Sequence, residues 1–133
     1  MDREELLNKA FVAMENAYAP YSHYPVGACV ACKDGNFFIG ANVENASYGL
    51  TNCGERSALF AAYSHGYRKD DIEAIAIVCG GPSIASPCGA CRQVLSELLN
   101  MDTPIYLANK TENRTTTIKE LLPYAFSSAE LNV

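Results

Sequence analysis

Residues 1–18 carry apolar side chains three and four positions apart, a spacing that places them on one side of a helix. We therefore predict an amphipathic helix that begins at Asp2 and ends near Tyr18, with Asp2 and Glu5 spaced as a capping box at its start. The following residues 19–25 contain two prolines and three aromatic rings, which excludes a helix and indicates an ordered loop.

Shorter runs of apolar and β-branched residues after this loop predict the strands of a sheet. Residues 26–31 and 37–43 flank Asp34 and Gly35, a pair typical of the tight turn in a β-hairpin. Further runs predict strands at residues 72–78, 104–108 and 115–117. The link between the last two runs is polar and too short to hold a crossover helix, so we expect these strands to pair antiparallel.

Helical patterns separate these strands. Residues 55–63 are apolar on nearly every side and are therefore expected to be buried on nearly every side. Residues 91–99 carry one apolar stripe, and a short helix is expected to begin at Glu120, before Pro123. The order of elements predicts the α/β class, as a three-layer α-β-α fold with a mixed five-stranded sheet. A chain of 133 residues is expected to form a single domain over residues 1–133.

Charge and composition narrow the partners of this domain. Ten basic and fifteen acidic residues give a net charge of −5, which argues against nucleic acid or an anionic membrane as the main partner. Charged residues make up 19% of the chain, below the usual share of about a quarter, so part of the surface is expected to be buried between subunits. The acidic start, and no apolar run near the ~20 residues that span a bilayer, predict a cytoplasmic protein. Cytoplasmic thiols stay reduced, so the six cysteines are not expected to form three disulfides.

Three of the six cysteines have the placement of metal ligands. Cys88 and Cys91 are separated by two residues at the start of a predicted helix, where both sulfurs can face one point and the helix dipole favours thiolates. Cys53 begins the other apolar helix, and successive strand-to-helix turns of such a sheet lie at one edge, so the three thiols can meet. Three thiolates with one open position predict a catalytic zinc site, with one Zn²⁺ per chain.

Glu55 and Arg56 follow Cys53 within the first turn of the same predicted helix. The Glu55 carboxylate could take a proton from a water on the zinc and return it to a substrate nitrogen, so we expect Glu55 to be catalytic. Arg56 is expected to offset the negative charge of three thiolates. The other cysteines are interpreted as packing residues, and the first two of them should face opposite sides of their strand: Cys29, Cys32 and Cys79.

The residues around these candidate ligands make the pattern more specific. The Cys-x-Glu of Cys53 and Glu55, followed by the Pro-Cys-x-x-Cys that begins at Pro87, resembles the zinc-dependent cytidine deaminases in their small, homotetrameric three-cysteine form. The resemblance runs in family order over nearly the whole chain, at residues 19–22, 42–46, 53–56, 87–93 and 120–123.

The resemblance implies a role for each matching residue of the zinc site. Cys53, Cys88 and Cys91 would hold the zinc ion. Glu55 would move the proton to the base and then to the departing ammonia, and Arg56 would hydrogen-bond the thiolates.

Five further residues would bind the substrate by the same resemblance. Asn42 and Glu44 would hold the ribose, and because they are two positions apart on a predicted strand their side chains should point the same way. Tyr24 stands where the family usually has a Phe that stacks on the base. Tyr48 and Phe126 would reach into the site of a neighbouring subunit.

These patterns predict hydrolytic deamination of cytidine and 2'-deoxycytidine to the uridines and ammonia, in pyrimidine salvage. An uncharged nucleoside suits the acidic chain better than a nucleotide or a nucleic acid does. One alternative is a blasticidin-S-type deaminase, although the Asn-x-Glu pair and the Arg after the glutamate speak against it. The other is a structural zinc module, which would need a fourth ligand, with Cys79 the candidate. Gly54 replaces the family's commoner Ala, which loosens the helix start by up to ~1 kcal/mol.

Overall fold

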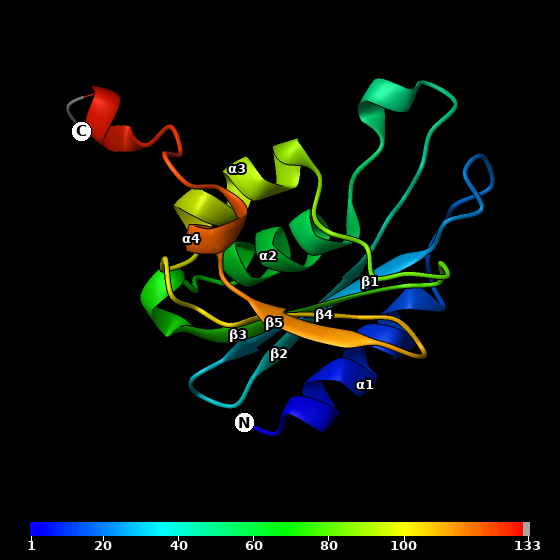
Figure 1. The fold of residues 1–133 in the computed structure, drawn as a ribbon, viewed down its shortest axis with the longest axis horizontal. Coiled ribbons are helices and arrows are strands. Elements are labelled where there is room, and N and C mark those ends of the chain that lie inside the picture. The colour runs from blue at the N-terminus through cyan, green and yellow to red at the C-terminus, as the bar shows by residue number, and fades with distance from the viewer. Residues whose placement is uncertain (132–133) are drawn as a thin grey trace.

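The computed structural model describes residues 1–131 and has a five-stranded mixed sheet in the order β2-β1-β3-β4-β5 (Figure 1). Only the β3–β4 pair is parallel, and the β4–β5 pair is antiparallel as predicted. The strands are β1 Val26–Cys32, β2 Phe37–Ala41, β3 Ile72–Cys79, β4 Ile105–Ala108 and β5 Asn113–Thr116. The α-helices are α1 Arg3–Met14, α2 Gly54–Ser64, α3 Gly89–Leu98 and α4 Ile118–Leu121. Three short 3-10 turns complete the described elements: Tyr48–Leu50, Lys69–Asp71 and Ser128–Leu131.

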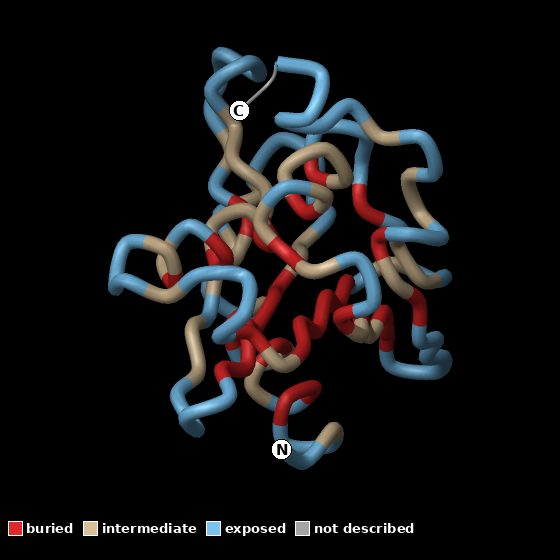
Figure 2. Tube along the Cα trace, turned by 90° about the vertical axis from the view of Figure 1, so that its left-hand side faces the viewer, coloured by how far each residue is buried: buried red, intermediate tan, exposed pale blue. Residues whose placement is uncertain are grey.

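Helices cover both faces of the sheet, which confirms the three-layer α/β prediction. α1 lies on one face, and α2, α3 and α4 lie on the other (Figure 1). Two apolar clusters separate along the same lines, one under α1 and one under α2 and α3. Cys29 belongs to the first cluster and Cys32 to the second, so the two thiols face opposite sides of β1 as expected. Figure 2 shows the buried segments at the centre of the molecule, within a shell of exposed loops.

The first helix is shorter than its apolar spacing predicts. Asp2 is its N-cap, as expected, but the helix ends at Met14 and not near Tyr18. The main chain of Tyr18 instead pairs like a strand, donating to the Asn42 carbonyl at 2.9 Å and accepting from the Glu44 amide at 2.8 Å. This pairing satisfies main-chain groups that a longer helix would need for itself, and so the tertiary contact overrides the local spacing.

The second strand is also shorter than predicted, because β2 ends at Ala41. Residues 42–44 continue in an extended path, where Val43 forms isolated bridges with Tyr18 and Asn52. The expectation that Asn42 and Glu44 lie on a strand was therefore wrong, although both side chains still reach the same pocket.

Two glycines let helices approach the sheet closely. A Cβ on Gly27 of β1 would lie 2.2 Å from the Ala10 carbonyl oxygen of α1, and a Cβ on Gly40 of β2 would lie 2.4 Å from the Ala58 amide nitrogen of α2. Such distances are too short for any real side chain, so α1 and α2 can pack this closely only because glycine stands at these positions. The close approach of α2 fixes where its first turn meets the strand ends.

The second helix is not buried on nearly every side, contrary to expectation. Its inner face is buried through Ala58, Leu59 and Ala62, whereas Phe60 is 41% exposed. The sheet and α3 cover only part of the helix, and so Phe60 faces outward from the single chain. In residues 1–131, no helix combines the length and the apolar character that crossing a membrane requires.

Candidate active site

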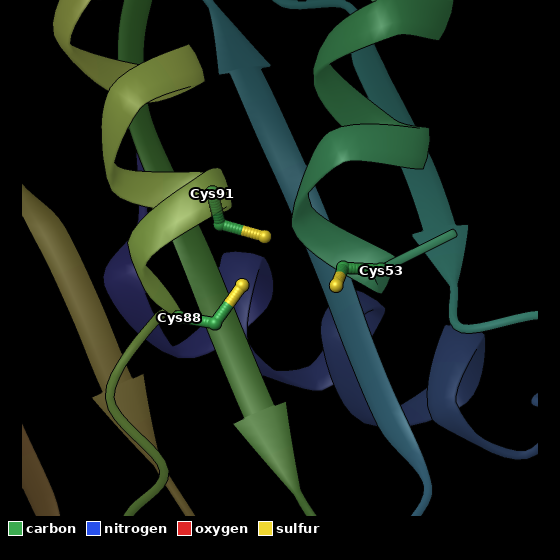
Figure 3. Close-up of side chains that lie close together, drawn as sticks. All are labelled: Cys53, Cys88 and Cys91. Atoms are coloured by element: carbon green, nitrogen blue, oxygen red, sulfur yellow. The ribbon is translucent and has the colours of Figure 1, made fainter. Parts of the chain in front are cut away.

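Three thiols converge where α2 and α3 begin. Cys53 is the N-cap of α2 and Cys88 is the N-cap of α3, while Cys91 lies in the first turn of α3. Their sulfur atoms lie within 4.8 Å of one another and point toward one another from the two helix starts (Figure 3). The structure thus brings together the three predicted ligands, although 34 residues separate Cys53 from Cys88 in the sequence.

This cluster has a donor set that suits zinc and a spacing close to that of a zinc site. Ligands at the usual Zn–S distance of about 2.3 Å are about 3.8 Å apart in a tetrahedral site, so each sulfur would need to shift by less than ~1 Å. Three sulfur donors of this kind are typical of zinc ligands. Cys79 is not part of the cluster found in residues 1–131, and its thiol donates to the Ser83 carbonyl at 3.2 Å. The cluster therefore offers three sulfur donors, and the fourth ligand that a structural zinc module needs is not supplied by Cys79.

The guanidinium of Arg56 provides positive charge beside the thiols. Its Nη2 atom donates to the Cys53 sulfur at 3.2 Å, and its buried Nε atom has no hydrogen-bond partner within residues 1–131. The hydrogen bond from the Cys91 thiol, with help from Arg56, lowers the pKa of Cys53 to about 5. The same shared proton raises the pKa of Cys91, and the contact with Cys53 raises the pKa of Arg56. Negative charge thus gathers on sulfur where a cation would bind.

Glu55 lies beside the thiols as the second residue of α2. It is only 5% exposed, and burial raises the pKa of its carboxyl group above the ordinary value. The pocket that its side chain lines has a volume of about 440 Å³, within the range typical of small-molecule sites. The walls come from β1, β3 and α2, and from the loops before β1, α2 and α3. The lining residues are Ser22, Tyr24, Val26, Asn42, Glu44, Thr51, Cys53, Gly54, Glu55, Ile77, Ala85, Ser86 and Cys88.

The Glu44 carboxylate is held at this pocket by the loop that precedes β1. Its Oε1 atom accepts hydrogen bonds from the Tyr21 and Ser22 amides, both at 3.1 Å, and its Oε2 atom accepts one from the Ser22 hydroxyl. The Ser22 hydroxyl is the main reason why the pKa of Glu44 lies below its ordinary value. Sequence reasoning assigned Ser22 no role, although the Pro-Tyr-Ser segment that contains it belongs to the motif it recognised.

Asn42 lies deeper in the pocket wall and is 8% exposed. Its Oδ1 atom accepts from the Val26 amide at 2.9 Å, and its Nδ2 atom donates to the Tyr24 carbonyl at 2.9 Å. The side chain thus braces the start of β1 and keeps one N–H and one lone pair for a ligand.

Tyr24 lines the pocket from the loop that precedes β1. Partial burial raises the pKa of its phenol to about 12, with a further contribution from Cys79. The ring packs against Gly81, where a Cβ would lie 2.7 Å from the Tyr24 Cε2 atom. The loop after β3 thereby sets how far this ring can tilt.

Tyr48 and Phe126 do not line the pocket. Tyr48 is 73% exposed and packs edge-on against Tyr21, with ring centroids 6.0 Å apart. Phe126 is 58% exposed and lines a separate hollow with Ser96 and Glu97.

Gly54 is the first residue of α2 and also lines the pocket. A Cβ there would lie 3.1 Å from the Val26 carbonyl oxygen, a tight but not prohibitive contact. The glycine therefore relieves a crowded contact at the helix start, which offsets part of its low helix propensity.

A cluster of three thiols beside a buried carboxylate that lines a small-molecule pocket is the arrangement of a zinc hydrolase. Residues 1–107 match the model of the cytidine and deoxycytidylate deaminase zinc-binding region. The chain belongs to this deaminase family.

Individual relatives are similar to this chain over nearly its whole length. A cytidine deaminase from Halalkalibacterium halodurans is 52% identical over 133 residues, covering 99% of this chain and 99% of the relative. One from Sporosarcina psychrophila is 46% identical over 133 residues, covering 99% and 96%. The crystal structure of a cytidine deaminase from Burkholderia pseudomallei aligns with a TM-score of 0.91 at 48% identity, covering 95% of this chain and 100% of that chain.

Proposed function

We propose that this protein deaminates cytidine and 2'-deoxycytidine hydrolytically to uridine and 2'-deoxyuridine, with release of ammonia, in pyrimidine salvage. The observation that carries the proposal is the convergence of three thiols beside the buried Glu55 carboxylate, which lines the pocket together with Cys53 and Cys88. The names of the relatives support the substrate class.

The chain's own residues divide the chemistry between them. Cys53, Cys88 and Cys91 would hold one Zn²⁺ per chain, and Arg56 would offset the thiolate charge. A bound zinc ion supplies a Lewis acid that lowers the pKa of water. The Glu55 carboxylate would accept a proton from the attacking water and donate it to the ring nitrogen next to the amino-bearing carbon. It would then accept the second proton of that water, from the new hydroxyl group on that carbon, and donate it to the amino group that leaves as ammonia. Its raised pKa suits a group that must both take and return a proton.

The substrate would be oriented by groups on the opposite wall. Glu44, already ionised and held by three donors, is placed to accept from a ribose hydroxyl, and the free N–H of Asn42 can donate to the sugar. Tyr24 would pack on the base. No phosphate is needed for these contacts, which favours a nucleoside.

The chain would act as a single domain over residues 1–133 and assemble as a homotetramer. Four exposed apolar side chains support an assembly: Tyr48, Leu50, Phe60 and Phe126. Of these, Tyr48 and Phe126 would complete the pocket of a neighbouring subunit. Light scattering at micromolar concentration should give the mass of four chains, and a monomer would overturn this part of the proposal. Six free cysteines support a reducing compartment such as the cytoplasm.

The test is ammonia release by zinc-loaded protein from a panel of compounds. We expect turnover of cytidine and 2'-deoxycytidine, much slower turnover of cytidine monophosphate, and none of blasticidin S. Absence of turnover of both nucleosides would overturn the proposal, and preference for blasticidin S would replace the substrate while keeping the chemistry. Adenosine serves as the negative control for nonspecific release.

A further inference from the structure

Arg92 follows the proposed ligand Cys91 and makes contacts that the proposed chemistry does not use. Its Nε atom donates to the Pro87 carbonyl at 2.8 Å, its Nη2 atom to the Ser86 hydroxyl at 2.6 Å, and its Nη1 atom to the Leu121 carbonyl at 2.6 Å. All three guanidinium nitrogens are therefore engaged, each with a different residue.

Two of these contacts hold the segment that carries Cys88. Ser86 and Cys88 both line the pocket, and Pro87 lies between them in the sequence. Arg92 therefore hydrogen-bonds the two residues directly before Cys88, the proposed zinc ligand. Residues 82–87 have no helix or strand to hold them in place. A loop without regular hydrogen bonding depends on side-chain contacts for its position.

The third contact connects this loop to the core through α4. Leu121 is the last residue of α4, and its carbonyl is one of those that a helix end leaves without an internal partner. α4 itself is anchored because Ile118 is fully buried in the core cluster and Thr117 caps the helix start. Arg92 thus links the loop before α3, which has no helix or strand of its own, to an element that is anchored in the core.

The geometry of the contact uses the shape of arginine and not only its charge. Within residues 1–131, no carboxylate lies in ion-pair range of Arg92, and the three acceptors are two carbonyls and a hydroxyl. A planar guanidinium can direct N–H groups to three separate acceptors, whereas the single nitrogen of a lysine cannot reach all of them.

We propose that Arg92 is a positioning residue that holds the Cys88 loop against the end of α4, so that the Cys88 sulfur stays in place for zinc. This inference rests on the proposed zinc site. It does not depend on the identity of the nucleoside. Groups that orient metal ligands without touching the metal typically change metal affinity 10- to 100-fold when removed.

The experiment measures zinc release to a coloured chelator by purified, zinc-loaded protein. We expect Arg92→Gln to release zinc about 10- to 100-fold faster than the unmodified protein, and Arg92→Lys to fall between the two. Release at the unmodified rate in Arg92→Gln would overturn the proposal. Release at the unmodified rate in Arg92→Lys would show that charge alone is enough and would overturn the directional role.

Two matched controls separate positioning from general loosening. Arg68 also donates to two main-chain carbonyls, those of Tyr63 at 3.1 Å and Tyr67 at 2.7 Å, but at the far end of α2. Gln93, next to Arg92, donates to the Phe126 carbonyl at 2.9 Å and holds no part of the loop. We expect Arg68→Gln and Gln93→Glu to release zinc at the unmodified rate, and acceleration as large as that of Arg92→Gln in either would overturn the proposal.

Two further measurements keep the test decisive. If Arg92→Gln does not fold, as judged by circular dichroism, Ser86→Ala removes only one partner and should still accelerate zinc release severalfold; no acceleration would overturn the proposal. Cobalt-substituted protein gives a second signature, because loss of the Cys88 sulfur would weaken the sulfur-to-cobalt absorption of Arg92→Gln. A protein that passes these tests but turns over no nucleoside would refute the proposed function alone.

Discussion

The three longer helices of this protein begin in two different ways. α1 begins after Asp2, whose side chain accepts a hydrogen bond from the Glu4 amide at 3.0 Å. α2 and α3 begin after Cys53 and Cys88, and neither side chain makes a cap hydrogen bond. A missing cap costs ~1 kcal/mol, so the two helix starts that bring the sulfurs together give up stability that α1 retains.

The second residues of α1 and α2 also differ, in their burial. Glu4 of α1 and Glu55 of α2 are both acids in a first turn, where the helix dipole favours negative charge. Glu4 is exposed to solvent, whereas Glu55 is buried and its carboxyl pKa is raised by that burial. Equivalent positions on two helices therefore differ in burial, which suits Glu4 to stabilising its helix and Glu55 to the proton transfer proposed for it.

Replacing the two acids should separate these roles most clearly. We expect Glu55→Gln to keep zinc and lose at least ~100-fold in kcat, because the amide cannot carry the proton. Glu4→Gln, the matched control, should leave kcat unchanged. Steady-state kinetics with metal analysis provides the measurement, and unchanged kcat in Glu55→Gln would remove Glu55 from the mechanism.

Replacing the N-cap residue of α2 should increase the stability of the metal-free protein and weaken its binding of zinc. Cys53→Ser removes a sulfur ligand but introduces a good N-cap. We expect zinc affinity to fall by at least ~100-fold, more than the loss of an outer partner, while the metal-free variant becomes up to ~1 kcal/mol more stable. Chelator competition and urea unfolding of metal-free protein measure the two effects. A metal-free Cys53→Ser variant that is less stable than the metal-free unmodified chain would contradict the prediction that Cys53 gives up stability at this helix start.

Removing the cap at α1 should affect stability alone. Asp2→Ala is expected to lower the free energy of unfolding by ~1 kcal/mol, because the Glu4 amide loses its acceptor. Asp2→Ser keeps an acceptor and should restore most of the loss. Urea unfolding tests this, and kcat/KM should stay the same in both variants. A change in kcat/KM would mean that α1 is coupled to the pocket after all.

A third carboxylate, Glu44, lies on neither helix start and should show the mildest effect. Its pKa is lowered chiefly by the Ser22 hydroxyl, so the carboxylate stays ionised as the pH falls below the ordinary carboxyl range. Ser22→Ala should raise that pKa, and the acid-side loss of binding should then begin at a higher pH. Calorimetry should measure uridine binding by Ser22→Ala and by the unmodified protein over the same acidic pH range. Both proteins contain Glu55, so a difference between their pH profiles reports on Glu44. Identical pH profiles would show that the ionisation of Glu44 does not contribute to ligand binding.

Local spacing predicted most elements and failed where distant segments interact. The hairpin turn at Gly35, with its positive φ of 94°, and the antiparallel return of β5 follow from short-range chemistry. The end of α1 and the end of β2 were misplaced together, because Tyr18 pairs with residues 42–44 and no periodicity encodes that contact.

The candidate site divides in the same way. The three clustered thiols and the acid beside them could be predicted, because two cysteines at Cys-x-x-Cys spacing share one helix turn and Glu55 is two residues from the third. The support of those residues was not: Ser22 holds Glu44, and Arg92 ties the Cys88 loop to α4. These bonds join segments 22 and 29 residues apart, a relationship that only the folded chain creates.

Residue type, near-neighbour spacing and the family resemblance were enough to predict the fold class, the family, and the three thiols and the acid that the structure brings together, because each of those signals is carried by short stretches of sequence. Tertiary structure decided that Glu55 is buried while Glu4 is exposed, that Asn42 braces a strand start, and that Phe60 faces outward. Burial and hydrogen-bond geometry depend on which segments the sheet and its close-packed helices bring into contact, and those contacts form only when the whole chain has folded.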